Sequence, residues 1–517
     1  FRGAAATKPG RDPEKALVVS RIAQDLERRI KVLLDLGLGY LDLERSTPTL
    51  SPGELQRLRL ATQVCSSLFG VVYVLDEPSA GLHPADTEAL LRALQGLKAS
   101  GNSLFVVEHE LDVIRAADWI VDVGPGAGQH GGRVLYSGPL SGLSRVTESE
   151  TGKYVFARGV KARRTPREPR GLLELRGVTR NNLRELSVDF PLGNLTSVTG
   201  VSGSGKSTLV SQALVGLLGD ALGHERPPEE SAEQDELERR DVAGFGAATL
   251  RGSELVKRLV QVDQRPIGRT PRSNLATYTG LFDDVRRLFA ATPLARKRRY
   301  DAGRFSFNVA RGRCETCQGE GFVMVELLFL PSVYSPCRTC GGARYNDATL
   351  AVKYRERSIA DVLALTVDEA HAFFAQEPAV ARALGTLREV GLGYLRLGQP
   401  ATELSGGEAQ RIKLATELQR SQRDGAVYVL DEPTTGLHPA DVERLMAQLQ
   451  RLVDGGATVI VVEHDMQVIA QSDHVIDLGP GAGDEGGEIV ATGPPEAVAR
   501  AKRSKTAAFL AQALSGG

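Results

Sequence analysis

The sequence predicts an α/β protein that contains two copies of one domain, each with a parallel sheet covered by helices on both faces. Three observations support this prediction. Stretches within residues 37–132 recur within residues 391–487 at an offset of 354 or 355. Short β-branched runs alternate with helical stretches in both copies. The 517 residues, 42% hydrophobic and 25% charged, are enough for two to four domains with sizeable cores.

The same order of buried strand, helix and buried strand is expected in each copy. The ranges are 71–75, 85–98 and 104–107 in the first copy, and 427–430, 440–452 and 458–462 in the second. Only the second copy has an additional strand, Gly-rich loop and helix, starting near Leu195. Because the sequence starts at Phe1 and not at Met, we expect the equivalent piece of the first copy to precede it.

The loop "GVSGSGKST" at 200–208 follows an apolar strand and opens a helix, the context that a GxxxxGK[ST] phosphate-binding loop requires. A chance Gly/Ser turn is the alternative. Backbone N–H groups of such a loop cradle phosphates, the Lys neutralises them, and the Ser hydroxyl can ligate Mg²⁺. The residues expected to bind ATP here are Gly200, Ser202, Gly203, Ser204, Gly205, Lys206, Ser207 and Thr208.

An acidic turn occurs twice, as "VLDEPSAGLHPAD" at 74–86 and "VLDEPTTGLHPAD" at 429–441; these are the first and second acidic turns below. Asp431 is predicted to hold the Mg²⁺ shell, and Glu432 to orient or deprotonate the attacking water. His464, which follows the next strand, is a candidate γ-phosphate contact. Gln264 is a candidate for positioning water and Mg²⁺. An isolated His would more often be a core or surface residue.

The stretch "LSGGE" at 404–408 precedes a helix, and Ser405 could simply be its N-cap. This stretch resembles the signature motif of the ATP-binding-cassette superfamily. The resemblance implies two cassettes paired head to tail, each signature closing on the phosphate loop of the other. The first signature, "LSPGE" at 50–54, would then complete the ATP site with Ser51, Gly53 and Glu54. Pro52 has no N–H to donate, which predicts slower hydrolysis there. A second half-site would comprise Ser405, Gly406, Gly407, Glu408, Asp76, Glu77 and His109.

Four of the five cysteines form two Cys-x-x-Cys pairs that are 19 residues apart. This spacing is typical of a structural zinc site, and disulfides or chance are the alternatives. All four coordination positions would be filled, so catalytic zinc is not expected. The predicted ligands are Cys314, Cys317, Cys337 and Cys340.

The cysteines lie in an insertion of about 190 residues that includes "VDQRPIGRTPRSNLATYTG" and "GRFSFNVARGRCETCQGEG". From about Leu33 onward the chain resembles the second half of UvrA, the damage-recognition ATPase of bacterial nucleotide excision repair. The resemblance implies ATP/ADP, Mg²⁺ and Zn²⁺ as cofactors, damaged double-stranded DNA as the target, and a homodimer in the cytoplasm. The resemblance leaves a UvrB-like partner open, since the region that binds UvrB in this family is not in this chain. The alternatives are a UvrA-like ATPase that gives resistance to DNA-intercalating drugs and, with less support, the motor of a transporter.

The net charge of −1 means that DNA contact requires a local basic patch. Residues 296–313 include seven Lys or Arg among aromatic residues. We interpret this stretch as a site of contact with DNA phosphates, and the alternative is a solvated basic surface. The acidic run 225–241 is interpreted as a loop. The candidate DNA-binding residues are Arg269, Arg272, Lys297, Arg298, Arg299, Arg304, Arg311 and Arg313.

The expected organisation has six segments and a zinc module. In the first half, residues 1–50 would form the end of the first signature or insertion region, and 51–157 the C-terminal part of the first cassette. Residues 158–170 would be a linker. In the second half, 171–250 would form the N-terminal part of the second cassette, 251–403 the second signature domain with a zinc module at about 308–345, and 404–517 the C-terminal part of the second cassette. No apolar run approaches the roughly 18–20 residues of a membrane helix, so no membrane partner is expected.

Overall fold

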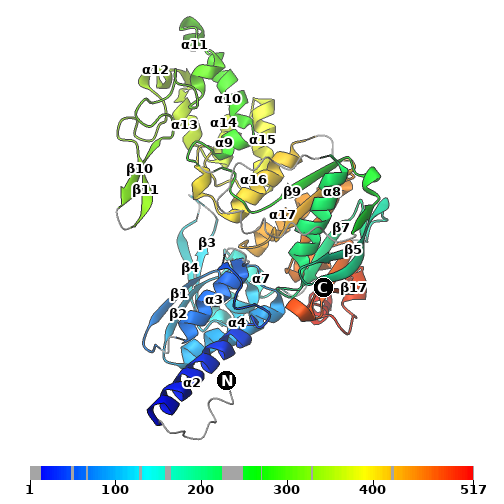
Figure 1. Ribbon diagram of the computed structural model, residues 1–517. Coiled ribbons are helices and arrows are strands. Elements are labelled where there is room, and N and C mark those ends of the chain that lie inside the picture. Colours follow the sequence, from blue (N-terminus) through cyan, green and yellow to red (C-terminus); the bar gives the residue numbers. More distant parts are fainter. Residues whose placement is uncertain are drawn as a thin grey trace.

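In the computed structural model, the chain is arranged in three bodies: the first half, the complete cassette and a lobe that projects from the cassette (Figure 1). The structure describes residues 13–515 apart from 48–49, 51, 66–67, 127, 129–130, 158–164, 224–247, 269, 328–329 and 421–423. Most of the expected linker and all of the acidic run at 225–241 therefore lie outside the described residues. The C-terminal end of the linker is held by Arg167, which donates hydrogen bonds to Asp473 and Asp454.

The first body is formed by residues 13–157. Its elements are α2 (Pro13–Asp35), α3 (Pro52–Cys65), β1 (Val72–Asp76), α4 (Pro84–Ala99), β2 (Ser103–Val107), α5 (Leu111–Arg115), β3 (Ile120–Gly124), β4 (Arg133–Gly138), α6 (Leu140–Leu143) and α7 (Glu150–Val155). Strands β1 and β2 pair in parallel, and β3 and β4 pair antiparallel. The predicted strand–helix–strand order is present.

The second body is the complete cassette. Its elements are β5 (Gly171–Arg180), β6 (Leu183–Leu192), β7 (Leu195–Gly200), η3 (Thr208–Leu214), α8 (Val215–Ala221), β8 (Thr249–Arg251), η5 (Ser253–Leu255), β9 (Arg258–Val262), η7 (Ala401–Glu403), α16 (Gly406–Leu418), β14 (Ala426–Asp431), α17 (Pro439–Asp454), β15 (Thr458–Val462), α18 (Met466–Ala470), β16 (His474–Gly479), η8 (Gly483–Glu485), β17 (Glu488–Gly493), α19 (Pro495–Val498) and α20 (Ala507–Ser515). Its main sheet has the order β17-β16-β7-β15-β14-β9, parallel except for β17.

The third body is the lobe inserted between β9 and α16. Its elements are α9 (Leu275–Tyr278), α10 (Leu281–Ala290), α11 (Pro293–Lys297), η6 (Ala302–Phe305), β10 (Phe322–Leu327), β11 (Leu330–Pro336), α12 (Asp347–Leu350), β12 (Lys353–Tyr354), β13 (Arg357–Ser358), α13 (Ile359–Ala364), α14 (Val367–Phe373) and α15 (Pro378–Glu389). Figure 1 shows this lobe projecting from the cassette, with the β10–β11 hairpin at its side. The apolar residues of the lobe continue into the core beneath the main sheet.

The strands of the first half are less buried than predicted. Val74 in β1 and Phe105 in β2 are 73% and 63% exposed, whereas the matching Val429 and Ile460 are 1% and 0% exposed. In the second half, β5, β6 and η3 cover that face of the sheet. No equivalent strand lies between β2 and β3 in the described part of the first half. The prediction of a sheet covered on both faces is therefore wrong for this half.

Candidate functional site

The phosphate loop connects a buried strand to a helix. Strand β7 is buried along its whole length and ends at Gly200, and the helix that follows begins at Lys206. Gly200, Gly203 and Gly205 have φ values of +134°, +75° and +104°, a region that L side chains rarely adopt. A Cβ on Gly200 would lie 2.1 Å from the Leu478 carbonyl oxygen. The glycine spacing is thus a steric requirement of this loop.

The expected ATP-binding residues of the loop all lie on this turn or on the first turn of its helix. The Lys206 ammonium is buried and donates to the carbonyls of Gly200 and Val201 at 2.9 and 3.0 Å. Burial lowers the pKa of Lys206, and the negative charges of Glu432, Asp86 and Asp431 oppose this shift. A cation held among carboxylates beside a Gly-rich loop is suited to bind phosphate and a divalent metal together.

Two predicted carboxylates come from the end of β14. Asp431 accepts a hydrogen bond from the Ser211 hydroxyl at 3.3 Å, and burial with the neighbouring Glu432 raises the pKa of Asp431 to about 6. Glu432 has φ +43°, and burial raises the pKa of its carboxyl group. A carboxylate with a raised pKa is a stronger base, as the proposed activation of water requires.

His464 and Gln264 both contact Glu432. The His464 Nε2 lies 3.6 Å from Glu432 Oε1, and the Gln264 amide donates to the Glu432 carbonyl at 3.0 Å. Burial and then Lys206 lower the pKa of His464 well below its usual value, so the ring is neutral. The structure thus brings together the four predicted residues Asp431, Glu432, His464 and Gln264 around the phosphate loop.

The first half lies directly against this loop. The Asp86 carboxylate, at the end of the first acidic turn, accepts a hydrogen bond from the Ser202 N–H at 3.1 Å. The Tyr40 ring lies so close that a Cβ on Gly203 would be 2.6 Å from it. The Tyr40 hydroxyl in turn donates to Glu54 of the first signature at 2.7 Å. Head-to-tail contact between the halves is therefore present within one chain.

The first signature contacts the phosphate loop indirectly, because its Glu54 binds Tyr40 and Tyr40 packs against Gly203. Ser51 lies outside the described residues, and Pro52 is the first residue of α3, where its missing N–H breaks no intrahelical bond. A Cβ on Gly53 would contact Leu82 and the Ala80 carbonyl of its own half, at 3.4 and 3.7 Å. The expected contact of Gly53 with nucleotide remains a prediction.

The second half-site repeats the geometry of the first, without a phosphate loop in the described residues. Asp76 ends β1, Glu77 has φ +44°, and the His109 Nε2 lies 3.5 Å from Glu77 Oε1. In the second signature, Ser405 caps α16 in a capping box with Glu408, so the N-cap interpretation is correct. Gly406 and Gly407 form the first turn of that helix.

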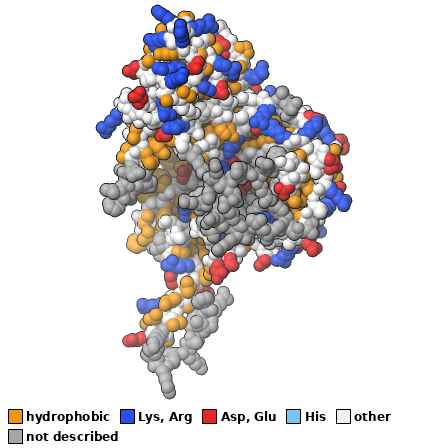
Figure 2. Space-filling model, turned by 45° about the horizontal axis from the view of Figure 1, so that its top comes forward, with side chains coloured by type: hydrophobic (Ala, Val, Ile, Leu, Met, Phe, Trp, Pro, Cys, Tyr) orange, Lys and Arg blue, Asp and Glu red, His pale blue; other side chains and the backbone are white. Residues whose placement is uncertain are grey.

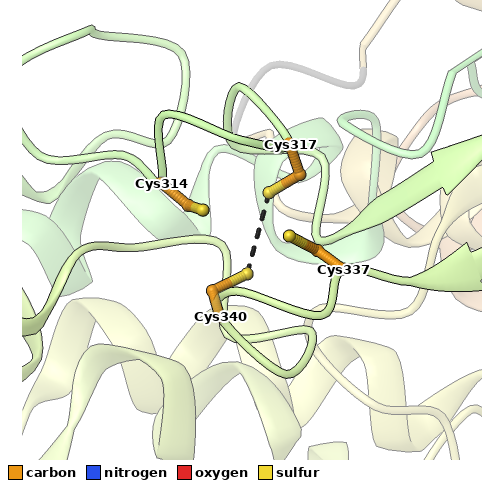
Figure 3. A group of neighbouring side chains, drawn as sticks. All are labelled: Cys314, Cys317, Cys337 and Cys340. Carbon is orange, nitrogen blue, oxygen red and sulfur yellow. Dashed lines mark hydrogen bonds between the residues drawn. The ribbon is translucent and has the colours of Figure 1, made fainter.

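The four predicted zinc ligands converge in the lobe (Figure 3). Their Sγ atoms all lie within 4.8 Å of one another, and those of Cys317 and Cys340 are 3.7 Å apart. A tetrahedron with Zn–S bonds of about 2.3 Å has sulfur atoms about 3.8 Å apart. Gly319 and Gly342 follow the two pairs at φ +85° and +89°, as tight knuckle turns need. The donor set fits zinc, and none of the five cysteines forms a disulfide.

Comparisons with known proteins agree with this geometry. A family model described as "AAA domain, putative AbiEii toxin, Type IV TA system" matches residues 376–470. "UvrABC system protein A" of Streptomyces avermitilis is 52% identical over 500 residues, 96% of this chain and 48% of the relative. The same protein of Thermus thermophilus is 52% identical over 516 residues, 99% of this chain and 52% of the relative.

A solved structure extends the match to the fold. The crystal structure of UvrA2 from Deinococcus radiodurans superposes with a TM-score of 0.91 at 68% identity, covering 99% of this chain and 61% of that one. The chain is UvrA-like. It has the ATP-binding-cassette fold with an inserted four-cysteine module, as the resemblance implied. The UvrA-like chain spans about half the length of the curated relatives it matches.

Part of the basic patch of the UvrA-like chain is exposed at the surface. Lys297, Arg298 and Arg299 are exposed at the end of α11, where the Arg298 guanidinium also donates to the Ala348 carbonyl at 3.0 Å, and Arg311 is exposed nearby in the sequence. Figure 2 shows Lys and Arg side chains gathered over the lobe that carries α11. No helix in the described part of the chain is both long and apolar enough to span a bilayer.

Other predicted DNA-binding residues are held by the lobe itself. The Arg304 guanidinium lies over the Tyr300 ring, 4.5 Å from its centroid. Arg272 forms an ion pair with a Glu carboxylate of the zinc module at 3.4 Å, and Arg313 donates to a Gln side chain of the same module. Arg269 lies outside the described residues. These contacts give Arg304, Arg272 and Arg313 a structural role beside any phosphate contact.

Sequence reasoning did not single out Tyr40, Asp86 or the His residues of the acidic turns, His83 and His438. Tyr40 and Asp86 contact the phosphate loop from the other half. The signal was available, because "GLGY" at 37–40 and "GLHPAD" at 81–86 recur unchanged in the second half. Identical short stretches in an otherwise diverged repeat indicate positions with the same task in both halves.

Proposed function

We propose that this chain is the ATP-hydrolysing, DNA-engaging part of a UvrA-like protein that recognises damaged duplex DNA in nucleotide excision repair. The observation that carries the proposal is the composite site: a phosphate loop from one half lies against Asp86 and Tyr40 from the other, and Tyr40 is bound to Glu54 of the first signature. A site shared between two halves links nucleotide binding to their relative position. Engagement of DNA can therefore be controlled by ATP binding and hydrolysis.

Each residue of the site has a defined task in this proposal. Lys206 neutralises the phosphates, and the loop N–H groups orient them. Ser207 and Asp431 would hold Mg²⁺, which supplies positive charge to the developing transition state. Glu432 orients and deprotonates the attacking water, with His464 and Gln264 holding its carboxylate and backbone in place. No nuclease chemistry is expected from these groups.

The target is proposed to be DNA for two reasons. The exposed basic residues of α11 suit phosphate contacts, and a four-cysteine module of the kind that orders small domains lies in the same lobe. Relatives at about half identity carry the name UvrABC system protein A. Assembly as a homodimer, a UvrB-like partner and a cytoplasmic location belong to the same proposal.

The test measures ATP turnover and DNA binding by this chain over a range of salt concentrations. Intact, ultraviolet-damaged and intercalator-loaded duplexes of one sequence are compared, with and without ATP. The proposal expects ATP hydrolysis and a preference for the damaged duplex that changes when ATP is added. A preference confined to the intercalator-loaded duplex would instead favour a drug-resistance ATPase, and no turnover together with no DNA binding would refute both.

A further inference from the structure

Each acidic turn contains a His whose two ring nitrogens have different partners. The His83 Nδ1 accepts a hydrogen bond from the Ala85 N–H at 3.2 Å and so caps helix α4. The proton of the neutral ring must therefore be on Nε2. Burial, and then the neighbouring His464, lower the pKa of His83 to about 3, which keeps the ring neutral.

The Nε2 of His83 is directed into the other half of the chain. It lies 3.1 Å from the Thr506 hydroxyl, and Thr506 in turn donates to Asp477 Oδ1 at 2.9 Å. His83 and Thr506 are 0% exposed and Asp477 is 1% exposed. These three residues, here called the first relay, connect the first acidic turn to the segment before α20 and to strand β16.

The same chain of hydrogen bonds occurs a second time with the halves exchanged. His438 caps α17 through the Ala440 N–H, its Nε2 lies 3.3 Å from Thr151, and Thr151 donates to Asp122 at 2.9 Å. His438, Thr151 and Asp122, the second relay, stand 355 positions from their counterparts, as His464 stands from His109. Two diverged halves that repeat one interaction across their interface indicate a task and not a packing accident.

Each relay also contacts the strand-end His of the opposite half. The His83 ring meets the His464 ring edge-on at 5.9 Å, and the His438 ring meets the His109 ring edge-on at 6.2 Å. On its other side, the first acidic turn places Gly81 against Glu432, where a Cβ would be 2.6 Å from Oε2. The first relay therefore fixes the turn that borders both His464 and Glu432.

We propose that His83, Thr506 and Asp477 act as positioning residues that lock the first acidic turn onto the hydrolysis site of the other half. The inference rests on the ATPase activity proposed above. Thr506 is central because its hydroxyl accepts from His83 and donates to Asp477 at the same time, which no apolar side chain can do. The second relay does the same for the half-site around Glu77 and His109.

The test compares Thr506→Val, which keeps the shape and removes the hydroxyl, with Thr506→Ser, which keeps the hydroxyl. Thr506→Val should lower kcat by about 10- to 100-fold with KM changed little, because a misplaced neighbour disturbs the transition state more than binding. Thr506→Ser should restore most of kcat. Thr151→Val, at a half-buried residue of the second relay, should lower kcat less.

Hydrogen exchange provides a readout that does not depend on turnover. Thr506→Val should speed amide exchange in residues 79–87, which belong to the other half, and Thr506→Ser should not.

If Thr506→Val does not fold, His83→Asn replaces it, because Asn still caps the helix but does not reach Thr506. Thr506→Val with wild-type kcat and unchanged exchange at 79–87 would overturn the inference. An inactive wild-type chain would refute the proposed ATPase activity, and the exchange data would then decide the inference alone.

Discussion

Gly81 provides a direct test of how the two halves share one hydrolysis site. It lies in the first acidic turn at φ +68°, and a Cβ there would be 2.6 Å from Glu432 Oε2 of the other half. Replacement by Ala therefore has two effects. It strains the backbone of the turn, and it displaces the carboxylate that we assign to activation of water.

The magnitudes of these effects follow from the geometry. A left-handed Ala costs about 1–2 kcal/mol relative to Gly. The contact falls about 0.8 Å short of the ordinary 3.4 Å, so the Glu432 carboxylate must move by about that distance. Displacements of about 1 Å at a reacting group cost up to about 100-fold in rate. We expect Gly81→Ala to lower kcat by about 10- to 100-fold, with little change in nucleotide affinity.

Gly436→Ala is the matched control, assayed by steady-state ATP turnover, nucleotide titration and thermal unfolding. Gly436 has φ +69° in the second acidic turn, and its Cβ would be 2.8 Å from Glu77 Oε2. The two variants therefore carry the same backbone strain, but only Gly81→Ala displaces the carboxylate beside the phosphate loop. Equal loss of kcat in both, or no loss in Gly81→Ala, would refute the assignment of Glu432 to this shared site.

Four further predictions address other parts of the molecule. Lys206→Ala should abolish tight nucleotide binding, whereas Glu432→Gln should bind nucleotide and lose turnover; wild-type rates in the second variant would contradict its role. Pro52→Gly should raise the turnover number if the missing N–H is limiting, and an unchanged or lower value would exclude that. Metal analysis should find one zinc ion per chain, and its absence would remove the zinc assignment. Replacing residues 297–299 by Glu should weaken binding to intact and damaged duplex alike and reduce its salt dependence; unchanged binding would place the DNA site elsewhere.

The repeated stretches made most of the fold predictable. Strand β15 and helices α4 and α17 lie within two residues of their predicted ranges, because β-branched runs and helical periods are local signals. Burial was not predictable in the same way. Val74 and Val429 occupy equivalent positions in similar sequences, yet one is 73% exposed and the other 1%. The difference comes from β5, β6 and η3, which lie far away in the sequence.

The residues of the site also differ in whether their role follows from local sequence or from contacts between distant segments. Lys206, Asp431 and the cysteines could be identified because their chemistry depends on spacing within a short stretch. Tyr40 and Asp86 lie in stretches that recur unchanged in the second half, but their contact with the phosphate loop becomes evident only where the first half meets the second. Among the basic residues, the sequence could not separate exposed Lys297 from Arg304, whose guanidinium lies over a Tyr ring.

The two relays explain why the acidic turns have stayed alike while their surroundings have diverged. Helix α4 is fixed at its start from both sides, through His83 to Thr506 and through Asp86 to the phosphate loop. In the second acidic turn, His438 has the relay contact to Thr151. The first relay is buried, whereas His438 and Thr151 are half-buried. The relay of the turn that borders Lys206, Glu432 and His464 is therefore the more buried of the two. This difference is expected if the relays serve hydrolysis more than they serve stability.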